Sequence, residues 1–178
     1  MDASRSSAIF RRIDHYELSL CLLCNRAGNR RNVERLFVIV SRLGDGVFWY
    51  VLIAALPLIY GPGALRVSLR LALTGVVCVL VYKTLKSTMV RQRPFILHKD
   101  IRRGTAPLDL YSFPSGHTLH AVAFSSVTVS YYPGLVWLVL PFAALVAMSR
   151  VVLGLHFPSD VAAGAVIGLL LARLAVGI

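Results

Sequence analysis

Eight residues of complementary chemistry lie in four short segments of this otherwise apolar sequence. They are Lys86, Arg93, Ser115, Gly116, His117, Arg150, His156 and Asp160. Three of them are cations, and the arginines present a fork of donors that matches the oxygens of a phosphate. Ser115 and Gly116 directly precede an apolar run, so their backbone N–H groups are expected at a helix start, which favours anions. Together these residue types predict a phosphate-binding site.

Two histidines and one aspartate could supply the reactive groups of such a site. Histidine can act as a nucleophile or as a general acid, so His117 and His156 could divide these tasks. Asp160 follows His156 by one helical turn, where its carboxylate can hold the imidazole N–H and select the tautomer. Spacing alone does not assign which histidine attacks. The sequence offers no carboxylate cluster for Mg²⁺ or Zn²⁺, so we predict chemistry without a metal or other cofactor.

The composition around these residues is that of a membrane protein. Apolar residues make up 57% of the chain and charged residues 15%, against about 25% charged in soluble domains. We predict an all-α, multi-pass bundle of about five spans, at 46–65, 67–86, 115–131, 135–152 and 159–177. Because successive spans alternate in direction, the four segments with reactive residues are expected at one face of the membrane.

The first 45 residues lack a run of the ~20 apolar residues that crosses a bilayer. Two stretches, 8–27 and 33–44, favour amphipathic helices that lie in the membrane interface. We therefore divide the chain into N-terminal interfacial helices over 1–45 and a transmembrane catalytic domain over 46–178. Residues 91–114 are polar and rich in proline, and we predict one long loop there. Gly164 and Gly168 are spaced so that another helix could approach closely.

The net charge of +11 indicates which partners to expect. Basic residues stand beside apolar runs, which favours membrane lipids and a lipid phosphate substrate over nucleic acid. The face with the reactive residues carries a further set of basic residues, Arg5, Arg11, Arg12, Arg26, Arg30, Arg31, Arg35, Arg42, Lys83, Arg91, Lys99, Arg102 and Arg103. The opposite face carries Arg66, Arg70 and Arg173. Because short basic loops stay in the cytoplasm, we predict a protein of the bacterial inner (plasma) membrane with a cytoplasm-facing site.

Three motifs in order give the sequence a family resemblance. "KSTMVRQRP" (86–94) matches K-x6-R-P, "PSGH" (114–117) matches the second motif, and "SRVVLGLHFPSD" (149–160) matches S-R-x5-H-x3-D. With these motifs the chain resembles the type 2 phosphatidic acid phosphatase (PAP2) superfamily, in its integral-membrane lipid phosphatase branch. The resemblance covers about 46–178, and the first 45 residues carry no motif of the family.

The resemblance implies a role for each motif residue. His156 would attack phosphorus and form a phosphohistidine, and Asp160 would orient it. His117 would protonate the leaving oxygen and then activate water. The phosphoryl oxygens would be held by the remaining motif residues, which are Lys86, Arg93, Ser115, the Gly116 amide and Arg150.

Several alternatives stay open at this point. The chain could hydrolyse a lipid phosphate of the phosphatidate, phosphatidylglycerophosphate or polyprenyl phosphate or diphosphate type. It could instead pass the phosphoryl group from His156 to another lipid, or bind lipid without catalysis, although the intact histidines argue against the last. His120 could face the pocket, but packing is favoured. Four loop residues, His98, Lys99, Arg102 and Arg103, could meet a headgroup, but surface charge is favoured.

Overall fold

The computed structural model describes residues 3–28, 30–107 and 109–177, with the side chains of all of these except 3–13 and 15. The helices are α1 (Ala3–Ala27), α2 (Arg31–Arg42), α3 (Phe48–Tyr60), α4 (Leu65–Thr88), α5 (Pro94–Leu97), α6 (Gly116–Tyr131), α7 (Val136–Val152) and α8 (Pro158–Val176). Short helical turns are η1 (Leu43–Val47), η2 (Pro62–Ala64) and η3 (Pro133–Leu135). The predicted all-α class is confirmed. The side chains of Arg5, Arg11 and Arg12, which contributed to the predicted sidedness, lie outside the described residues.

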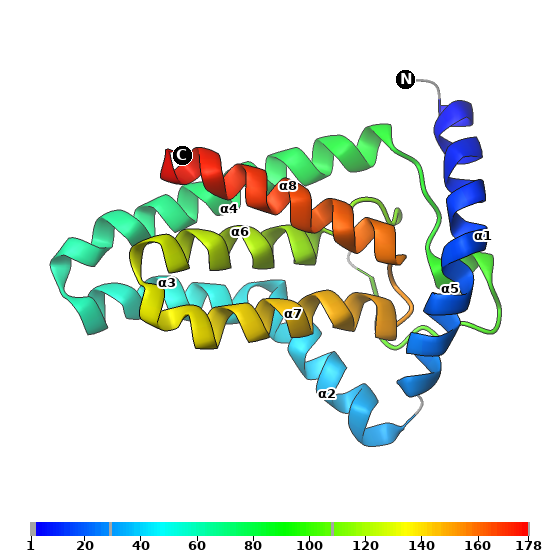
Figure 1. Cartoon of the computed structure of the whole chain (residues 1–178), viewed down its shortest axis with the longest axis horizontal. Coiled ribbons are helices and arrows are strands. Elements are labelled where there is room, and N and C mark those ends of the chain that lie inside the picture. Colours follow the sequence, from blue (N-terminus) through cyan, green and yellow to red (C-terminus); the bar gives the residue numbers. More distant parts are fainter. Residues whose placement is uncertain (1–2, 29, 108, 178) are drawn as a thin grey trace.

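Within the residues that the structure describes, four segments are long and apolar enough to cross a membrane: Arg31–Tyr60, Pro62–Thr88, Pro133–Val152 and Pro158–Val176. The remaining predicted span, 115–131, corresponds to α6, whose 16 residues rise about 24 Å, less than the ~30 Å of a hydrocarbon core. In Figure 1, α6 nevertheless runs between the same two ends of the bundle as α4, α7 and α8, and it packs against all three. Its neighbours therefore cover much of its surface.

One kinked helical segment replaces the expected break between an interfacial helix at 33–44 and the first span. It consists of α2, η1 and α3. The kink lies at Gly46, where φ is 139° and a Cβ atom would lie 2.7 Å from the ring of Tyr50, so the turn requires glycine. Figure 1 shows α2 leaving the bundle at an angle beyond this kink. The domain boundary that we place between residues 45 and 46 coincides with the kink and stays a prediction.

Helices α6 and α8 pack closely because two glycines of α8 face the backbone of α6. A Cβ atom on Gly164 would lie 2.6 Å from the carbonyl oxygen of Ser115, and one on Gly168 would overlap the carbonyl oxygen of Leu119. Between helices in lipid there is little hydrophobic driving force, so close van der Waals packing of this kind holds them together. The close approach predicted at these glycines is confirmed.

The two ends of the bundle differ in construction (Figure 1). At one end, here called the loop end, α4 and α7 finish, α6 and α8 begin, and the connection from residue 89 to 115 covers them together with α1. That connection was expected to be a plain loop, but Pro94 starts one turn of helix, α5, as proline does at a first helical position. At the other end, here called the turn end, η2 and η3 connect neighbouring helices directly.

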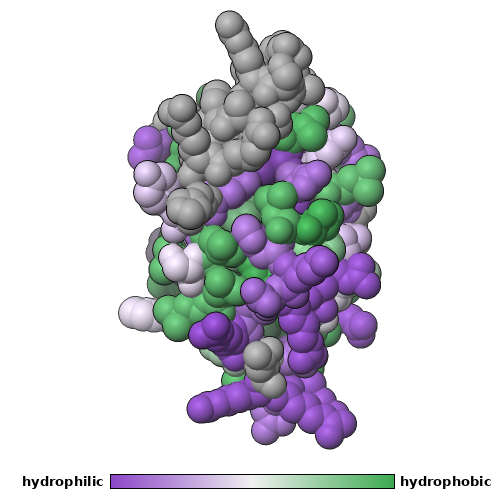
Figure 2. All heavy atoms as spheres, turned by 90° about the vertical axis from the view of Figure 1, so that its right-hand side faces the viewer, coloured by the Kyte–Doolittle hydropathy of each residue, from purple (hydrophilic) through white to green (hydrophobic). Residues whose placement is uncertain are grey.

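The surface agrees with a membrane location. Large apolar side chains on the bundle point outward, among them Leu58, Trp137 and Leu174, which are 85%, 86% and 79% exposed. Figure 2 looks at the loop end, where hydrophilic side chains gather over the lower part of the view. The exposed residues around the turn from α1 to α2 include Arg26, Arg30, Arg31 and Arg35.

Candidate active site

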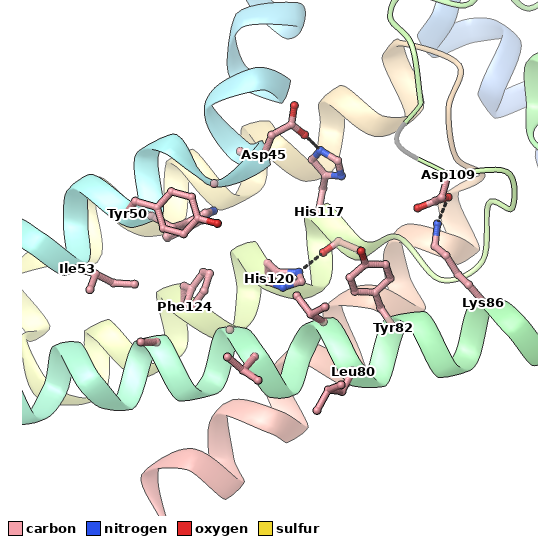
Figure 3. Close-up of a pocket in the computed structure, with 18 of the residues that line it drawn as sticks. Asp45, Tyr50, Ile53, Leu80, Tyr82, Lys86, Asp109, His117, His120 and Phe124 are labelled. Atoms are coloured by element: carbon pink, nitrogen blue, oxygen red, sulfur yellow. Dashed lines mark hydrogen bonds and ion pairs between the residues drawn. The ribbon is translucent and has the colours of Figure 1, made fainter.

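A cavity of about 580 Å³ lies between α3 and α4, with α6 behind it (Figure 3). Its length is lined mainly by apolar and aromatic side chains, including Trp49, Tyr50, Ile53, Val76, Val79, Leu80, Tyr82 and Phe124. At the loop end it is lined by Lys86, Arg93, Asp109, His117 and His156. A cavity that is charged at one end and apolar along its length matches a lipid with an anionic head.

Five of the eight residues that the sequence singles out line this cavity, namely Lys86, Arg93, Gly116, His117 and His156. The other three, Ser115, Arg150 and Asp160, are buried nearby, each 2% exposed or less. Ser115 bonds within the scaffold: its N–H donates to the carbonyl oxygen of Asp160 at 3.0 Å, and its hydroxyl lies 3.0 Å from that of Thr118.

Two cations at the end of the cavity share one carboxylate, Asp109. Lys86 Nζ lies 2.5 Å from Asp109 Oδ1, and Arg93 Nη2 lies 2.7 Å from the same atom. Burial alone would raise the pKa of Asp109, but the hydrogen bonds and charges of Lys86 and Arg93 outweigh burial and hold this pKa below its usual value. A stable carboxylate therefore occupies the donors that would face a phosphate.

Arg150 contributes a third cation behind these two. Its guanidinium donates to the hydroxyl of Ser41 on α2, and its Nε atom has no hydrogen-bond partner within the described residues. The side chain is almost completely buried. A buried guanidinium with an unused donor is costly unless an anion binds it, which is consistent with a site that takes one.

His156 sits between this cationic group and Asp160. Its Nε2 atom is 3.2 Å from Arg93 Nη1, and its Nδ1 atom is 3.7 Å from Asp160 Oδ2. Burial, and then the positive charges of Arg93 and Arg150, hold the pKa of His156 well below its usual value. The imidazole is therefore neutral, and a proton on Nδ1, facing the carboxylate, leaves the lone pair of Nε2 directed at the cations.

Asp160 is held at the start of α8, where Pro158 occupies the first turn. Its Oδ2 atom accepts the N–H of Phe157 at 2.8 Å, and its Oδ1 atom pairs with Arg91. The local sequence thus starts the helix and fixes one carboxylate oxygen towards His156 at the same time.

The second histidine, His117, lies on the first turn of α6 and pairs through Nε2 with Asp45 of η1 (Figure 3). His120 lies one turn further along the same helix and also lines the cavity. Its Nδ1 atom is 2.8 Å from the carbonyl oxygen of Gly116, and its ring packs edge-on against Tyr82. His120 therefore both faces the cavity and has packing partners.

Apart from Asp160, sequence reasoning did not find the carboxylates of this site. Asp45 and Asp109 lie in segments without helical periodicity that the motifs do not include, so they gave no signal. Asp14 and Glu17 did give a sequence signal, because they stand three residues apart on one face of the predicted helix over 8–27. Four residues that could have met a headgroup, His98, Lys99, Arg102 and Arg103, lie away from the cavity lining. Of these, Arg102 forms an exposed ion pair with Glu34.

Within the part of the chain that the structure describes, no three His, Cys, Asp or Glu side chains are grouped so that they could hold a metal ion. The acidic residues near the cavity are instead each paired with a cation or a histidine, as Asp109 is with Lys86 and Asp45 is with His117. The donor set at the end of the cavity is thus suited to an anion.

Comparisons with known proteins agree with this geometry. A family model described as "PAP2 superfamily" matches residues 63–178, more than half of the chain. The undecaprenyl-diphosphatase of Sulfolobus acidocaldarius is 30% identical over 145 residues, which are 80% of this chain and 69% of that protein. The crystal structure of Aquifex aeolicus LpxE superposes with a TM-score of 0.79 at 27% identity, covering 92% of this chain and 96% of that one. A PAP2-type phosphatidylglycerolphosphate phosphatase from Bacillus subtilis gives a TM-score of 0.69 at 26% identity, over 89% and 84% of the two chains.

Proposed function

Because this chain belongs to the PAP2 superfamily of membrane lipid phosphatases, we propose that it hydrolyses a lipid phosphate through a phosphohistidine on His156. One observation carries the proposal. The Nε2 atom of His156 lies among cations at the charged end of a cavity that is otherwise apolar. A lipid in this cavity would place its phosphate beside that nitrogen and its chains between α3 and α4.

In the first step, the lone pair of His156 Nε2 attacks phosphorus and the bond from phosphorus to the leaving oxygen breaks. His117, in its protonated form, gives its proton to that oxygen, and the lipid alcohol departs from a monoester or the lipid monophosphate from a diphosphate. The transferring phosphoryl group is held by Lys86, Arg93 and Arg150 and by the Gly116 N–H at the start of α6, while Ser115 bonds to the scaffold behind it. Preorganised donors of this kind usually make the largest contribution to catalysis.

In the second step, neutral His117 takes a proton from a water molecule, and the resulting hydroxide attacks phosphorus. The bond from phosphorus to Nε2 breaks, inorganic phosphate leaves, and His117 is protonated again. Asp160 stays ionised and stabilises the positive charge on His156 in both steps by accepting a hydrogen bond from the Nδ1–H group. The 3.7 Å separation of these groups would have to shorten as that charge develops, as catalytic hydrogen bonds in ligand-free sites commonly do.

The substrate we propose is a monoester or diphosphate of a phosphatidate, phosphatidylglycerophosphate or polyprenyl type. Support comes from the apolar lining of the cavity and from two of the relatives, an undecaprenyl-diphosphatase and a phosphatidylglycerolphosphate phosphatase. We also propose that the protein lies in a bacterial inner membrane with this site facing the cytoplasm, on the basis of its basic loops.

The proposal is tested with purified protein in detergent or vesicles. Phosphate release is measured from matched lipid monophosphates and diphosphates, with and without EDTA, and the lipid products are followed after adding an acceptor lipid. We expect release of inorganic phosphate that EDTA does not affect. Loss of activity with EDTA that a divalent ion restores would contradict the metal-free mechanism, and phosphorylated acceptor lipid in place of phosphate would identify a phosphotransferase.

A further inference from the structure

We propose that Arg91 is a positioning residue that holds Asp160 for His156 and connects this pair to α1. The proposal rests on the function above, in which Asp160 orients His156. Arg91 lies in the first motif segment but is neither its lysine nor its final arginine. The helix α1 lies outside the part of the chain that the family model matches.

The guanidinium of Arg91 has its donors directed at protein acceptors. Nε and Nη2 donate to Asp14 Oδ1 at 2.9 and 2.5 Å, and Nη2 also donates to Glu17 Oε2 at 2.8 Å. Nη1 donates to Ser159 Oγ at 2.7 Å and to Asp160 Oδ1. A guanidinium has five N–H donors, so these bonds engage all of them.

This arrangement excludes Arg91 from phosphate binding and fixes its orientation. Its side chain has no exposed area and it does not line the cavity among the described residues. The guanidinium lies over the ring of Phe157, 4.2 Å from the ring centre. With its plane set by the ring and its donors set by acceptors on α1 and α8, Arg91 holds Asp160 Oδ1 in one position. That leaves Oδ2 for the N–H of Phe157 and for His156.

Helix α1 reaches the same place by a second route. Glu17 Oε1 accepts the backbone N–H of Ser159 at 2.6 Å, and Glu17 Oε2 accepts the Ser159 hydroxyl at 2.7 Å. Ser159 is in the first turn of α8, whose free N–H groups need acceptors. Glu17 therefore satisfies the start of the helix that carries Asp160 and also binds the arginine that holds Asp160.

Lysine cannot reproduce this arrangement, because it carries one compact ammonium in place of a flat fork. Arg91→Lys keeps the charge, but it cannot bind both α1 carboxylates and Asp160 with the same geometry. Glu17→Gln keeps the shape of the side chain, but its amide nitrogen would face donors of Ser159 or Arg91. We expect both variants to let Asp160 turn away from His156 without changing the phosphate-binding cations.

The experiment measures kcat and KM of the full-length protein for one lipid phosphate. Arg91→Lys is expected to lower kcat about 10- to 100-fold, with KM little changed. This is the range seen in metalloproteins when a group that orients a metal-binding histidine is removed. Glu17→Gln should give a smaller decrease of the same kind. Glu34→Gln is the matched control, since Glu34 is a carboxylate of α2 that pairs with exposed Arg102, and it should leave kcat unchanged.

A double-mutant cycle with Asp160→Asn separates positioning from a general structural role. If Arg91 acts through Asp160, then Arg91→Lys or Glu17→Gln should cause little further loss of kcat once Asp160 is replaced. Losses that multiply in the double variants, an unchanged kcat in both single variants, or a loss that follows a lowered melting temperature would overturn the inference. A normal kcat in Asp160→Asn itself would instead count against the proposed function, so the two failures are distinguishable.

Discussion

The loop end and the turn end of the bundle differ in how they connect the helices and in whether their charged side chains are buried. At the turn end, η2 and η3 connect α3 to α4 and α6 to α7 directly, and the charged residues nearby, Arg66, Arg70 and Arg173, are exposed. At the loop end, a buried set of charged side chains comes together, comprising Asp14, Lys86, Arg91, Arg93, Arg150 and Asp160.

The difference follows from the cost of burying charge. A buried ion loses its hydration and must find partners in the protein. The loop end supplies them from outside the four candidate spans as well: α1 provides Asp14 and Glu17, and the connection between α4 and α6 provides Asp109. In the function proposed here, the cations would then attract a phosphate from surroundings of low dielectric constant, where electrostatic attraction is strong. The turn end only reverses the chain and needs no such additions.

Substitutions at the two ends should differ most in their effect on turnover when the proposed nucleophile, His156, is replaced. His156→Ala removes the only group proposed to bond with phosphorus, so turnover of the lipid phosphate should fall to the background rate. Arg70→Gln at the turn end, which removes bonds to Tyr131 and to the carbonyl oxygen of Ala175, should leave kcat and KM unchanged. Steady-state phosphate release with matched melting curves is the measurement. Undiminished turnover in His156→Ala would refute the assignment.

A decrease of orders of magnitude is expected for Asp160→Asn. The amide can still accept the N–H of Phe157, so the start of α8 should form, but it no longer stabilises a positive imidazole. In a serine protease, the comparable change lowers kcat by about 10⁴. A near-normal rate in a folded variant, judged by its melting temperature, would show that another group orients His156.

Replacing His117 tests whether it serves the leaving group. A positioned general acid contributes typically 10²–10⁴-fold, so His117→Ala should slow hydrolysis of an alkyl phosphate by about that factor. With a leaving group that needs no proton, such as a nitrophenolate, the loss should be much smaller because the first step no longer requires the acid. Equal losses on both substrates would mean that His117 does not act as the acid.

How much of the loop end could be anticipated depends on how each residue is placed. Lys86, His117 and Arg150 stand at the boundaries of apolar runs, so hydropathy and the alternation of spans are enough to bring them together. Asp45 and Asp109 are placed by a π-helical turn and an irregular loop, whose paths depend on tertiary contacts that no local pattern encodes. Glu17 lies between these two cases. The sequence predicts the helix face on which it lies, but it does not predict the residues to which it bonds.

The same reasoning explains the misjudged helix boundaries. Hydropathy separated residues 33–44 from the first span because Arg42 and Asp45 interrupt the apolar run. In the structure the helix continues through them, since Asp45 meets His117 and Gly46 absorbs the kink. The charge that suggests a boundary in the sequence is part of the site in three dimensions. The helix predicted at 115–131 agrees in its bounds with α6, which is short for a span, and its partners surround much of it.

Replacing Asp109 is expected to have a modest effect, and it should strengthen phosphate binding where the variants above lower activity. Its carboxylate occupies Lys86 Nζ and Arg93 Nη2, so phosphate must displace it or share these donors with it. Asp109→Asn removes the competing charge and should strengthen inhibition by inorganic phosphate several-fold. The measurement is the inhibition constant of phosphate at fixed substrate. Weaker inhibition in the variant would mean that Asp109 supports the cations in place of competing with the ligand.

The comparison of the two ends also predicts a difference that leaves activity unchanged. If the loop end faces the cytoplasm, an impermeant thiol reagent added to intact cells should not reach a cysteine there but should reach one at the turn end. Lys99→Cys and Gly63→Cys provide the pair, since Lys99 is exposed and a side chain at Gly63 would meet no atom within 4 Å. The native Cys21 and Cys78 are buried and Cys24 is half-buried, so unmodified protein sets the background. Labelling of Lys99→Cys with protection of Gly63→Cys would reverse the predicted orientation, and the basic residues of the loop end would then face anionic headgroups of the outer leaflet.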